Sequence, residues 1–388
     1  MMQISPEIQL FIREHSSDDV RVLALQAKKY PDIDMPTVIT QIAGRKVAAE
    51  KIPSWWEIEK IWYPKHLSLE QCSSEITARY KARLLQGDSL TDLTGGFGID
   101  CSFLATGFKS ATYVERQEEL CEIAAHNFPV LNLNHINIKN EDGVTYLQAM
   151  SPVDCLFLDP ARRNEHGGKT VAISDCEPNV AELEELLLQK ANRVMIKRSP
   201  MLDLSLALKE LKQTQEVHIL SVNNECKELL ILLGQTSPAE ISIHCVNLFT
   251  KGTQKEQHFV FTREQEQCSE CTYTDSLETY LYEPNASLLK AGAFRSIAAA
   301  YPVRKLHPNS HLYTSDTFIE NFPGRIFRIV NQCSFNKKEV KENLADLKKA
   351  NVTVRNFPAT VAELRKRIHL AAFFLCFYLI CCFVRLYL

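Results

Sequence analysis

The chain has 388 residues, of which 45% are hydrophobic and 23% are charged. These fractions are typical of a soluble globular protein and exclude a disordered or collagen-like chain. The length exceeds that of one ordinary domain and indicates two or three. The formal net charge of −3 hides an asymmetry, because residues 1–285 hold 28 Lys and Arg against 41 Asp and Glu (−13), whereas residues 286–370 hold 15 against 6 (+9). The basic segment predicts an anionic partner, with nucleic acid as the first candidate.

The 13 cysteines are scattered through apolar stretches rather than spaced as a disulfide framework. The first residues have neither the basic start nor the apolar core of a signal peptide. Together these features predict buried free thiols and a cytoplasmic location.

One pattern resembles a metal site, because Cys268-x-x-Cys271 is followed by His307-x-x-x-His311. The 35 residues between the two pairs far exceed the spacing in zinc fingers. Pro308, between the histidines, argues against a ligand-bearing helix. We therefore predict no metal.

The order of segments predicts an α/β protein with a helical start. Apolar residues recur at helical spacing over residues 5–80, with Pro31 and Pro36 as breaks. From residue 88, short apolar runs alternate with helical stretches, which predicts a mostly parallel sheet covered on both faces and ending in an antiparallel hairpin. The seven expected strands are 89–93, 111–114, 135–138, 153–158, 193–196, 217–222 and 229–233.

Past residue 240 the pattern predicts a second, α+β domain. Residues 241–248 and 258–262 alternate as paired strands do, and 324–330 is another strand. Helices are expected over 284–300, starting at Pro284, and over the Lys-rich segment 337–350.

The segment most informative about function is Asp92–Asp100, in which an acidic residue ends the first strand and three glycines fill the turn before a helix. Glycine lets the backbone pass close to a ligand, and a helix start offers free N–H groups. A Gly-rich turn is weak evidence alone, since Rossmann dehydrogenases also have one. The residues that we expect to bind a cofactor here are Asp92, Thr94, Gly95, Gly96, Gly98 and Asp100.

Carboxylates also follow the later strands. The second strand ends at Glu115-Arg116, about 20 residues after the turn, where an acid accepts hydrogen bonds from ribose hydroxyls. Asp142-Gly143 follows the third strand and suits an adenine amine, and Asp159 follows the fourth. The spacings of 23, 50 and 67 residues from Asp92 put all four acids at the carboxyl edge of one sheet. Each alone could be a helix cap or a surface acid.

With these motifs the sequence resembles the class I S-adenosylmethionine-dependent methyltransferases over roughly residues 70–235. Their Gly-rich first motif matches 92–100, their ribose acid matches Glu115, their adenine-side acid matches Asp142, and their acid-Pro motif matches Asp159-Pro160. The resemblance implies a Rossmann-like domain with a seven-stranded mixed sheet and S-adenosyl-L-methionine as cofactor.

The resemblance narrows to enzymes that modify RNA. The segment 66–81 is similar to the helix that precedes the first motif in RNA-modifying members, including the trimethylguanosine synthase-like group. The whole chain resembles bacterial methyltransferases with a C-terminal THUMP-like domain. THUMP domains bind RNA, which implies methylation of a tRNA or rRNA base and agrees with the basic C-terminal segment.

The acceptor side departs from the usual pattern of amine methyltransferases, because Ala161 and Arg162 stand where a proline and an aromatic are usual. We expect Asp159, Pro160 and Arg162 to be catalytic, and Arg163, Lys197 and Arg198 to hold substrate phosphates. Gly167-Gly168 makes 163–175 a candidate lid. Covalent pyrimidine methylation is disfavoured because no Cys follows the fifth strand.

Two other functions stay open. The departure at Ala161 and Arg162 is compatible with a nucleotide- and RNA-binding protein that has lost catalysis. A dinucleotide-dependent dehydrogenase is disfavoured by Asp142 and by the Asp159-Pro160 motif.

The expected domains are a helical region (1–68), a methyltransferase domain (69–236), a THUMP-like domain (237–368) and an anomalous apolar tail (369–388). The tail has three interpretations: an altered reading frame, a short membrane-seeking anchor that Arg385 interrupts, or a buried strand or helix. No stable protein partner is expected, and membrane contact of the tail is the less favoured alternative.

Overall fold

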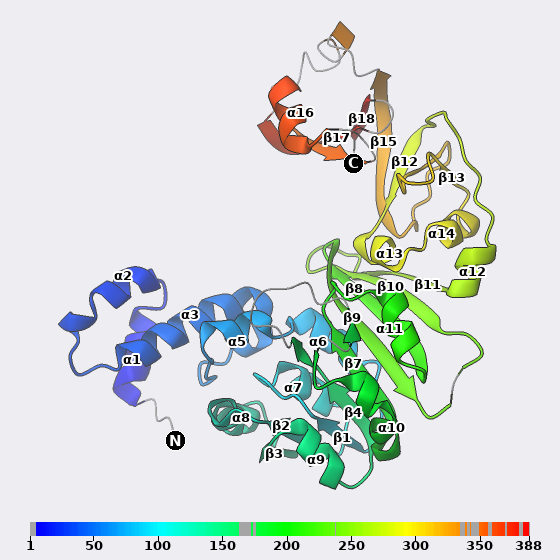
Figure 1. Cartoon of the computed structure of the whole chain (residues 1–388). Coiled ribbons are helices and arrows are strands. Elements are labelled where there is room, and N and C mark those ends of the chain that lie inside the picture. Colours follow the sequence, from blue (N-terminus) through cyan, green and yellow to red (C-terminus); the bar gives the residue numbers. More distant parts are fainter. Residues whose placement is uncertain are drawn as a thin grey trace. The chain divides into compact units, whose positions relative to one another are not determined.

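The computed structural model describes residues 5–162, 172–173, 176–236, 238–333, 338–339, 342, 349–355, 359–368, 371–379 and 383–387. The chain forms two compact units. Figure 1 shows the whole chain, with colours that follow the residue number. Unit 1 comprises residues 1–216 and 229–238, and unit 2 comprises 217–228 and 239–388. The expected domain boundaries stay predictions.

Unit 1 begins with the predicted helical region. Side-chain caps fix several helix starts: Ser5, Asp19 and Asp34 accept hydrogen bonds from backbone N–H groups of the first turns. Phe11, Leu23, Met35, Val38 and Ile42 are buried in one cluster. The helices are α1 (Pro6–Glu14), α2 (Val20–Leu25), the 3₁₀ turn η1 (Ala27–Lys29), α3 (Met35–Lys51), α4 (Pro53–Trp56), α5 (His66–Gln71) and α6 (Glu75–Ala82).

The sheet that follows confirms the predicted α/β fold. Its hydrogen-bonded strand order is β8-β9-β7-β4-β1-β2-β3, in which β7, β4, β1, β2 and β3 are parallel and β9 is antiparallel to β7. Helices α7–α11 alternate with these strands and cover both faces (Figure 1). The elements are β1 (Ser89–Asp92), α7 (Ile99–Ala105), β2 (Ser110–Glu115), α8 (Glu118–Val130), β3 (Ile136–Asn140), α9 (Gly143–Ala149), β4 (Val153–Leu158), β5 (Ala161–Arg162), β6 (Cys176–Glu177), α10 (Val180–Lys190), β7 (Ala191–Arg198), α11 (Leu204–Glu210), β8 (Thr214–Val222) and β9 (Glu225–Gly234).

Aromatic side chains fix the helical region against the Gly-rich segment after β1. Trp55 is buried and meets the Phe97 ring edge-on, with 5.2 Å between the ring centroids. Both belong to a cluster that also holds Tyr63, Ile99 and Leu120, so α3, α4, α7 and α8 share one core. The fold thereby places α5 and α6 beside the loop that ends at α7.

Unit 2 is mixed α+β, as expected. β10 and β11 extend the first sheet beyond β8, in the order β8-β10-β11, so that sheet has nine strands instead of the predicted seven. A second sheet has the order β13-β14-β12-β15-β18-β17-β16. The elements are β10 (Ser242–Leu248), β11 (Glu256–Thr262), α12 (Arg263–Cys268), β12 (Tyr280–Pro284), α13 (Ala286–Ala291), α14 (Arg295–Ala300), β13 (Arg304–Lys305), β14 (Tyr313–Ser315), β15 (Gly324–Cys333), β16 (Lys349–Val354), α16 (Val361–Ile368), β17 (Ala371–Leu379) and β18 (Phe383–Tyr387).

The single helix predicted over 284–300 is two helices. Pro284 ends β12 instead of starting a helix, and Asn285 caps α13 by accepting from the Leu288 N–H. Gly292 then adopts a left-handed backbone (φ 77°) that ends α13 before α14 begins. The helix predicted over 337–350 lies mostly outside the described residues.

The apolar tail contains β-strands, which agrees with the strand alternative among its three interpretations. β17 runs parallel to β16 and antiparallel to β18, and β18 pairs with β15. Among the described residues, no helix has the length and apolar character needed to cross a bilayer.

Candidate functional site

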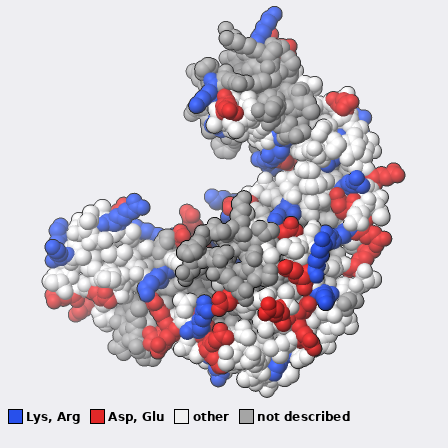
Figure 2. Space-filling model, viewed as in Figure 1, with Lys and Arg blue, Asp and Glu red and all other residues white. Residues whose placement is uncertain are grey.

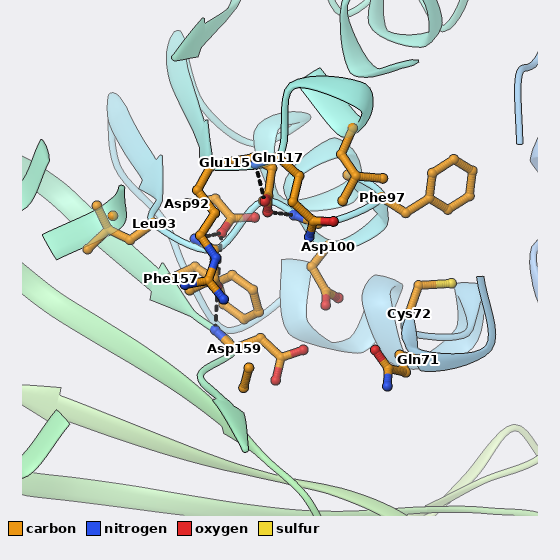
Figure 3. Close-up of a pocket in the computed structure, with 18 of the residues that line it drawn as sticks. Gln71, Cys72, Asp92, Leu93, Phe97, Asp100, Glu115, Gln117, Phe157 and Asp159 are labelled. Carbon is orange, nitrogen blue, oxygen red and sulfur yellow. Dashed lines mark hydrogen bonds between the residues drawn. The ribbon is translucent and has the colours of Figure 1, made fainter. Parts of the chain in front are cut away.

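A cavity of about 260 Å³ opens at the carboxyl edge of the unit 1 sheet, where β1, β2 and β4 end (Figure 3). The structure brings most of the predicted site residues to its wall. Those that line it are Asp92, Thr94, Gly95, Gly96, Gly98, Asp100, Glu115, Arg116, Asp142, Gly143, Asp159 and Lys197.

The Gly-rich turn needs glycine for two different reasons. Gly96 and Gly98 have φ values of 55° and 88°, which side chains other than glycine rarely adopt. A Cβ on Gly95 would lie 2.2 Å from the Tyr113 ring, so the loop lies directly on β2. A Cβ on Gly143 would similarly lie 2.2 Å from the Leu93 carbonyl oxygen, which brings the start of α9 against the same loop.

Glu115 closes the turn. Its Oε2 accepts from the Gly96 N–H and its Oε1 from the Gln117 N–H, both at 2.9 Å, as the dashed lines in Figure 3 show. The side chain is 8% exposed and lines the cavity. Because a carboxylate has about four acceptor sites, these two bonds leave Glu115 able to accept from ligand hydroxyls.

Asp92 is a buried acid with one free oxygen among the described residues. Its Oδ1 accepts from the Thr94 N–H at 2.9 Å, whereas no hydrogen bond within the described chain reaches the buried Oδ2. Burial raises the pKa of Asp92 well above its ordinary value, and the nearby Asp100, Asp159 and Glu115 carboxylates add to this rise. A protonated Asp92 can donate one hydrogen bond to a ligand.

Asp142 has a structural task as well as a place in the cavity wall. Its Oδ1 accepts from the N–H groups of Val144 and Thr145, both at 3.0 Å, and thereby caps α9. The helix-cap interpretation of this acid is therefore correct, and its role toward a cofactor stays a prediction.

Asp100 is the centre of a buried ion-pair network. Its carboxylate lies 3.0 Å from the Lys81 Nζ and 3.2 Å from the Lys197 Nζ, and it accepts from the Ser73 hydroxyl at 2.7 Å. Lys81 is fully buried and also donates to Ser73 at 2.9 Å. Burial alone would raise the pKa of Asp100, but Lys197 and Lys81 outweigh it and lower the pKa to about 2. Asp100 is therefore an anionic anchor for two lysines.

Lys197 connects this anchor to Asp159. Its Nζ donates to the Asp159 Oδ2 at 2.6 Å, and the Asp159 N–H donates to the Thr94 hydroxyl, also at 2.6 Å. In Figure 3 the Asp100 and Asp159 side chains point toward the same central space. The direction of the Asp159 carboxylate is thus fixed from two sides, while its side chain stays 38% exposed.

The expectation that Lys197 and Arg198 hold substrate phosphates needs correction. Both side chains are buried: Lys197 lies in the ion-pair network, and Arg198 donates to the Pro160 carbonyl at 3.3 Å and to the Cys176 sulfur. Pro160 is itself buried. The side chain of an Arg at the end of a strand can point into the protein interior when carbonyl and sulfur acceptors lie there. The sequence alone does not show whether it points inward or toward solvent.

The structure describes only some of the remaining residues that we expect on the acceptor side of the cavity. β5 carries Arg162 and pairs with β6, in the register Arg162 with Cys176. Arg116 lies at the exposed rim, 3.5 Å from the Glu177 carboxylate. Arg163 and most of the candidate lid 163–175 lie outside the described residues.

Sequence reasoning missed Ser73, Lys81 and Glu177. Lys81 ends the segment 66–81 that carried the family resemblance, but a lysine in a helix ordinarily indicates a solvated face. The spacing to Asp100 offers no signal, because the contact joins elements that only the fold brings together.

The Cys268 and Cys271 pair does not join His307 and His311 in a metal-ligand cluster within the described part of the chain. Cys268 is exposed, and Phe294 stacks on the His311 ring at 3.5 Å between centroids.

Comparison with known protein families gives two matches in unit 2. Residues 280–323 match a ferredoxin-like domain, and residues 324–380 match a THUMP-like domain. The second match extends into the apolar tail, so the altered-reading-frame interpretation has no support over 369–380. No curated protein matches the chain.

Among solved structures, the chain is similar to one from Porphyromonas gingivalis W83 described as a "putative methyltransferase". The identity is 33%, the match covers 98% of this chain and 96% of that one, and the TM-score is 0.86. Weaker matches include an S-adenosylhomocysteine complex from Streptococcus mutans (13% identity, 41% and 96% coverage, TM-score 0.30) and an rRNA methylase from Streptococcus thermophilus (14%, 41% and 93%, 0.31). The last two scores are too low to support an argument.

The buried network predicts that Lys81→Met destabilises the protein. Removing Lys81 leaves the buried Asp100 carboxylate with one of its two lysine partners, and we expect the free energy of unfolding to fall by about 3 kcal/mol. Urea unfolding followed by circular dichroism measures the loss. The matched control is Lys109→Met, which breaks an exposed pair with Asp88 and should cost less than about 1 kcal/mol. Equal losses in the two variants would show that the network contributes no special stability.

Proposed function

Because the chain belongs to the family of the Porphyromonas gingivalis W83 protein and has the class I methyltransferase fold, we propose that it is an S-adenosylmethionine-dependent methyltransferase that acts on RNA. The observation that carries this proposal is the charge of the cavity at the sheet edge. Its wall holds two cations, Arg116 and Lys197, against six acids, of which burial drives only Asp92 toward its neutral form: Asp92, Asp100, Glu115, Asp142, Asp159 and Glu177.

This charge favours a cationic cofactor. S-adenosylmethionine carries a sulfonium and an ammonium against one carboxylate, so its net charge complements an acidic wall. A nicotinamide dinucleotide instead brings a pyrophosphate with two negative charges. Lys197 cannot readily serve that pyrophosphate, since it is buried between Asp100 and Asp159. The dehydrogenase alternative is therefore disfavoured on electrostatic grounds as well.

The residues present fit the proposed cofactor. The left-handed backbone at Gly96 leaves open space, with no atom closer than 3.8 Å to a Cβ built there. Glu115 retains acceptor capacity for ribose hydroxyls, and the unshared Asp92 Oδ2 offers a hydrogen-bond donor when protonated. When bound, the cofactor supplies an electrophilic methyl group.

Asp159 is the residue that we assign to the acceptor. Methyl transfer mainly requires that the nucleophile be aligned with the methyl group. The Lys197 Nζ donates a hydrogen bond to the Asp159 Oδ2. Among the described residues no hydrogen bond reaches the Asp159 Oδ1, so that oxygen can accept from an exocyclic amine. The bond from the Asp159 N–H to Thr94 ties this acceptor group to the cofactor loop. Pro160 and Arg162 follow directly and would shape the acceptor side.

RNA recognition is assigned to unit 2, through its THUMP-like match. The surface near α10 of unit 1 is poorly suited to hold phosphates: on the face drawn in Figure 2, acidic side chains gather where α10 lies, and this helix carries Glu182, Glu184 and Glu185. We propose tRNA or rRNA as the substrate class, a cytoplasmic location, and no stable protein partner.

Several charges of the basic segment are used within the fold. Arg304 pairs with Glu278, while Arg325 and Arg355 both pair with Glu283. Lys305 is 3% exposed and donates to the Pro308 carbonyl at 2.8 Å, and burial lowers its pKa. Among the other cations of the basic segment that we expect to meet phosphates, Lys338 and Lys366 are described and exposed, and Arg365 of α16 is half-buried.

Glu115→Ala should weaken S-adenosylhomocysteine binding about 10-fold or more, because it removes hydrogen bonds to a charged acceptor worth roughly 1.5–3 kcal/mol. Titration calorimetry on the full chain measures the affinity. Glu115→Gln keeps one side-chain oxygen that can accept from the loop N–H groups. Comparing it with Glu115→Ala separates the effect of Glu115 on the loop from its direct contact with the ligand. The control is Glu119→Ala, which lies nearby on α8 and pairs only at the surface with Lys65. Tighter binding of NADH than of S-adenosylhomocysteine would overturn the cofactor assignment.

Asp159→Ala should abolish methyl transfer while leaving S-adenosylhomocysteine affinity within a few-fold, because its carboxylate serves the acceptor. The substrate is found by incubating the wild-type protein with labelled methyl donor and total RNA, followed by nucleoside mass spectrometry. Near-normal turnover by the variant would remove Asp159 from the catalytic assignment. Cofactor binding without transfer to any RNA by the wild type would favour the binding protein without catalysis.

The double variant Arg365→Ala/Lys366→Ala should weaken RNA binding and flatten its dependence on salt. Each lost contact with a single-strand phosphate reduces the log–log slope by about 0.7, so two contacts give about 1.4. Binding isotherms at several salt concentrations measure the slope. Lys65→Ala/Lys109→Ala removes two exposed lysines of unit 1 and should leave the slope unchanged. If both doubles behave alike, α16 does not bind phosphates.

A further inference from the structure

Three histidines of unit 2 come together although they lie far apart in sequence. His218 is on β8, His244 on β10 and His258 on β11, and these strands are neighbours in one sheet. The β10–β11 register pairs His244 with Val260 and Val246 with His258, so His244 and His258 are diagonal neighbours on the same face. None of them belongs to the cavity in unit 1.

Their nitrogen atoms lie at distances close to those around a metal ion. His244 Nδ1 is 3.1 Å from His258 Nε2. Two nitrogens bound to one tetrahedral zinc, each about 2.0–2.1 Å from the ion, are about 3.4 Å apart. Ligand atoms of His218 and His244 lie within 4.8 Å of one another. A carboxylate oxygen of Glu216 also lies within that distance, but Glu216 forms an ion pair with Arg193 and is not counted as a ligand.

The solvent exposure of the three rings increases from His218 to His258, so an ion can approach the site from solvent. His218 is 2% exposed, His244 is half-buried and His258 is exposed, so the row leads from solvent to the interior. The His218 and His244 rings are stacked, with centroids 4.3 Å apart and planes at 16°. Two parallel rings cannot both direct a lone pair at one ion, so binding requires the His218 ring to turn about its side-chain bonds.

We propose that His218, His244 and His258 form a binding site for a divalent transition-metal ion of the zinc class. Three imidazole nitrogens suit zinc, cobalt, nickel or copper rather than magnesium or calcium. Three protein ligands leave the fourth position of a tetrahedral shell to a water molecule. The ion ties β10 and β11 to β8 and takes no part in methyl transfer.

The test uses the full-length protein, stripped with a chelator and titrated with Co²⁺. The expected result is one ion per chain, with the visible absorption of tetrahedral cobalt and without the near-ultraviolet band that thiolate ligands produce. Zn²⁺ should displace the Co²⁺ and raise the melting temperature of the wild type, which provides a measurement that depends on no variant. Absence of stoichiometric binding overturns the proposal.

Variants then locate the site. His244→Gln and His258→Gln should each weaken Co²⁺ binding 10-fold or more, and His258 is exposed, so its substitution leaves the fold intact. The matched control is Cys268→Ser/Cys271→Ser, which removes the pair that most resembles metal ligands in the sequence and should leave binding unchanged. Loss of binding in the cysteine variant, or unchanged binding in both histidine variants, places the ion elsewhere and refutes this site.

Discussion

The site in unit 1 depends on the pairing of two lysines with the single buried carboxylate of Asp100. Lys81 comes from α6, Asp100 from α7 and Lys197 from the end of β7, so one carboxylate joins three elements that are distant in sequence. Each of these charges would be costly to bury alone. The helical region, the Gly-rich turn and the sheet edge therefore have one favourable arrangement, and that arrangement directs Lys197 toward Asp159.

This network also explains how a predominantly acidic cavity is stable. Carboxylates that lie close together at a sheet edge repel one another. Here the repulsion is reduced in a different way at each carboxylate. Asp100 is held ionised by its two lysines, whereas Asp92 is driven toward its protonated form by burial. Glu115 and Asp142 instead accept backbone N–H groups. Neighbouring acids thus acquire distinct chemical states from their surroundings.

The sequence predicted what repeats locally and missed what depends on packing. Strand and helix alternation, the Gly-rich turn and the strand-end acids are local patterns, and the structure confirms the mixed, mostly parallel sheet that they imply, although β10 and β11 extend it from the predicted seven strands to nine. The inward turn of Arg198 and the burial of Lys81 depend on acceptors from other elements, to which a single sequence gives no access. The split of the helix over 284–300 could have been seen at Asn285 and Gly292, a helix cap and a helix stop that the apolar pattern concealed. The charge balance of +9 likewise overstated the free cations, because Glu278 and Glu283 neutralise arginines of the same segment.

The hairpin of β8 and β9 has a consequence for how the protein is made. Its turn, with Asn223 and Asn224 both at positive φ, belongs to unit 2, but the chain then returns to complete unit 1 before it continues. On the ribosome, unit 1 cannot finish its sheet until Gly234, the last residue of β9, has emerged, and the outer edge of β8 stays unpaired until β10 is synthesised. An open strand edge favours association between chains. A nascent or prematurely ended chain of about 240 residues would therefore expose the edge of β8 in addition to that of β3, and continued translation covers the β8 edge with β10.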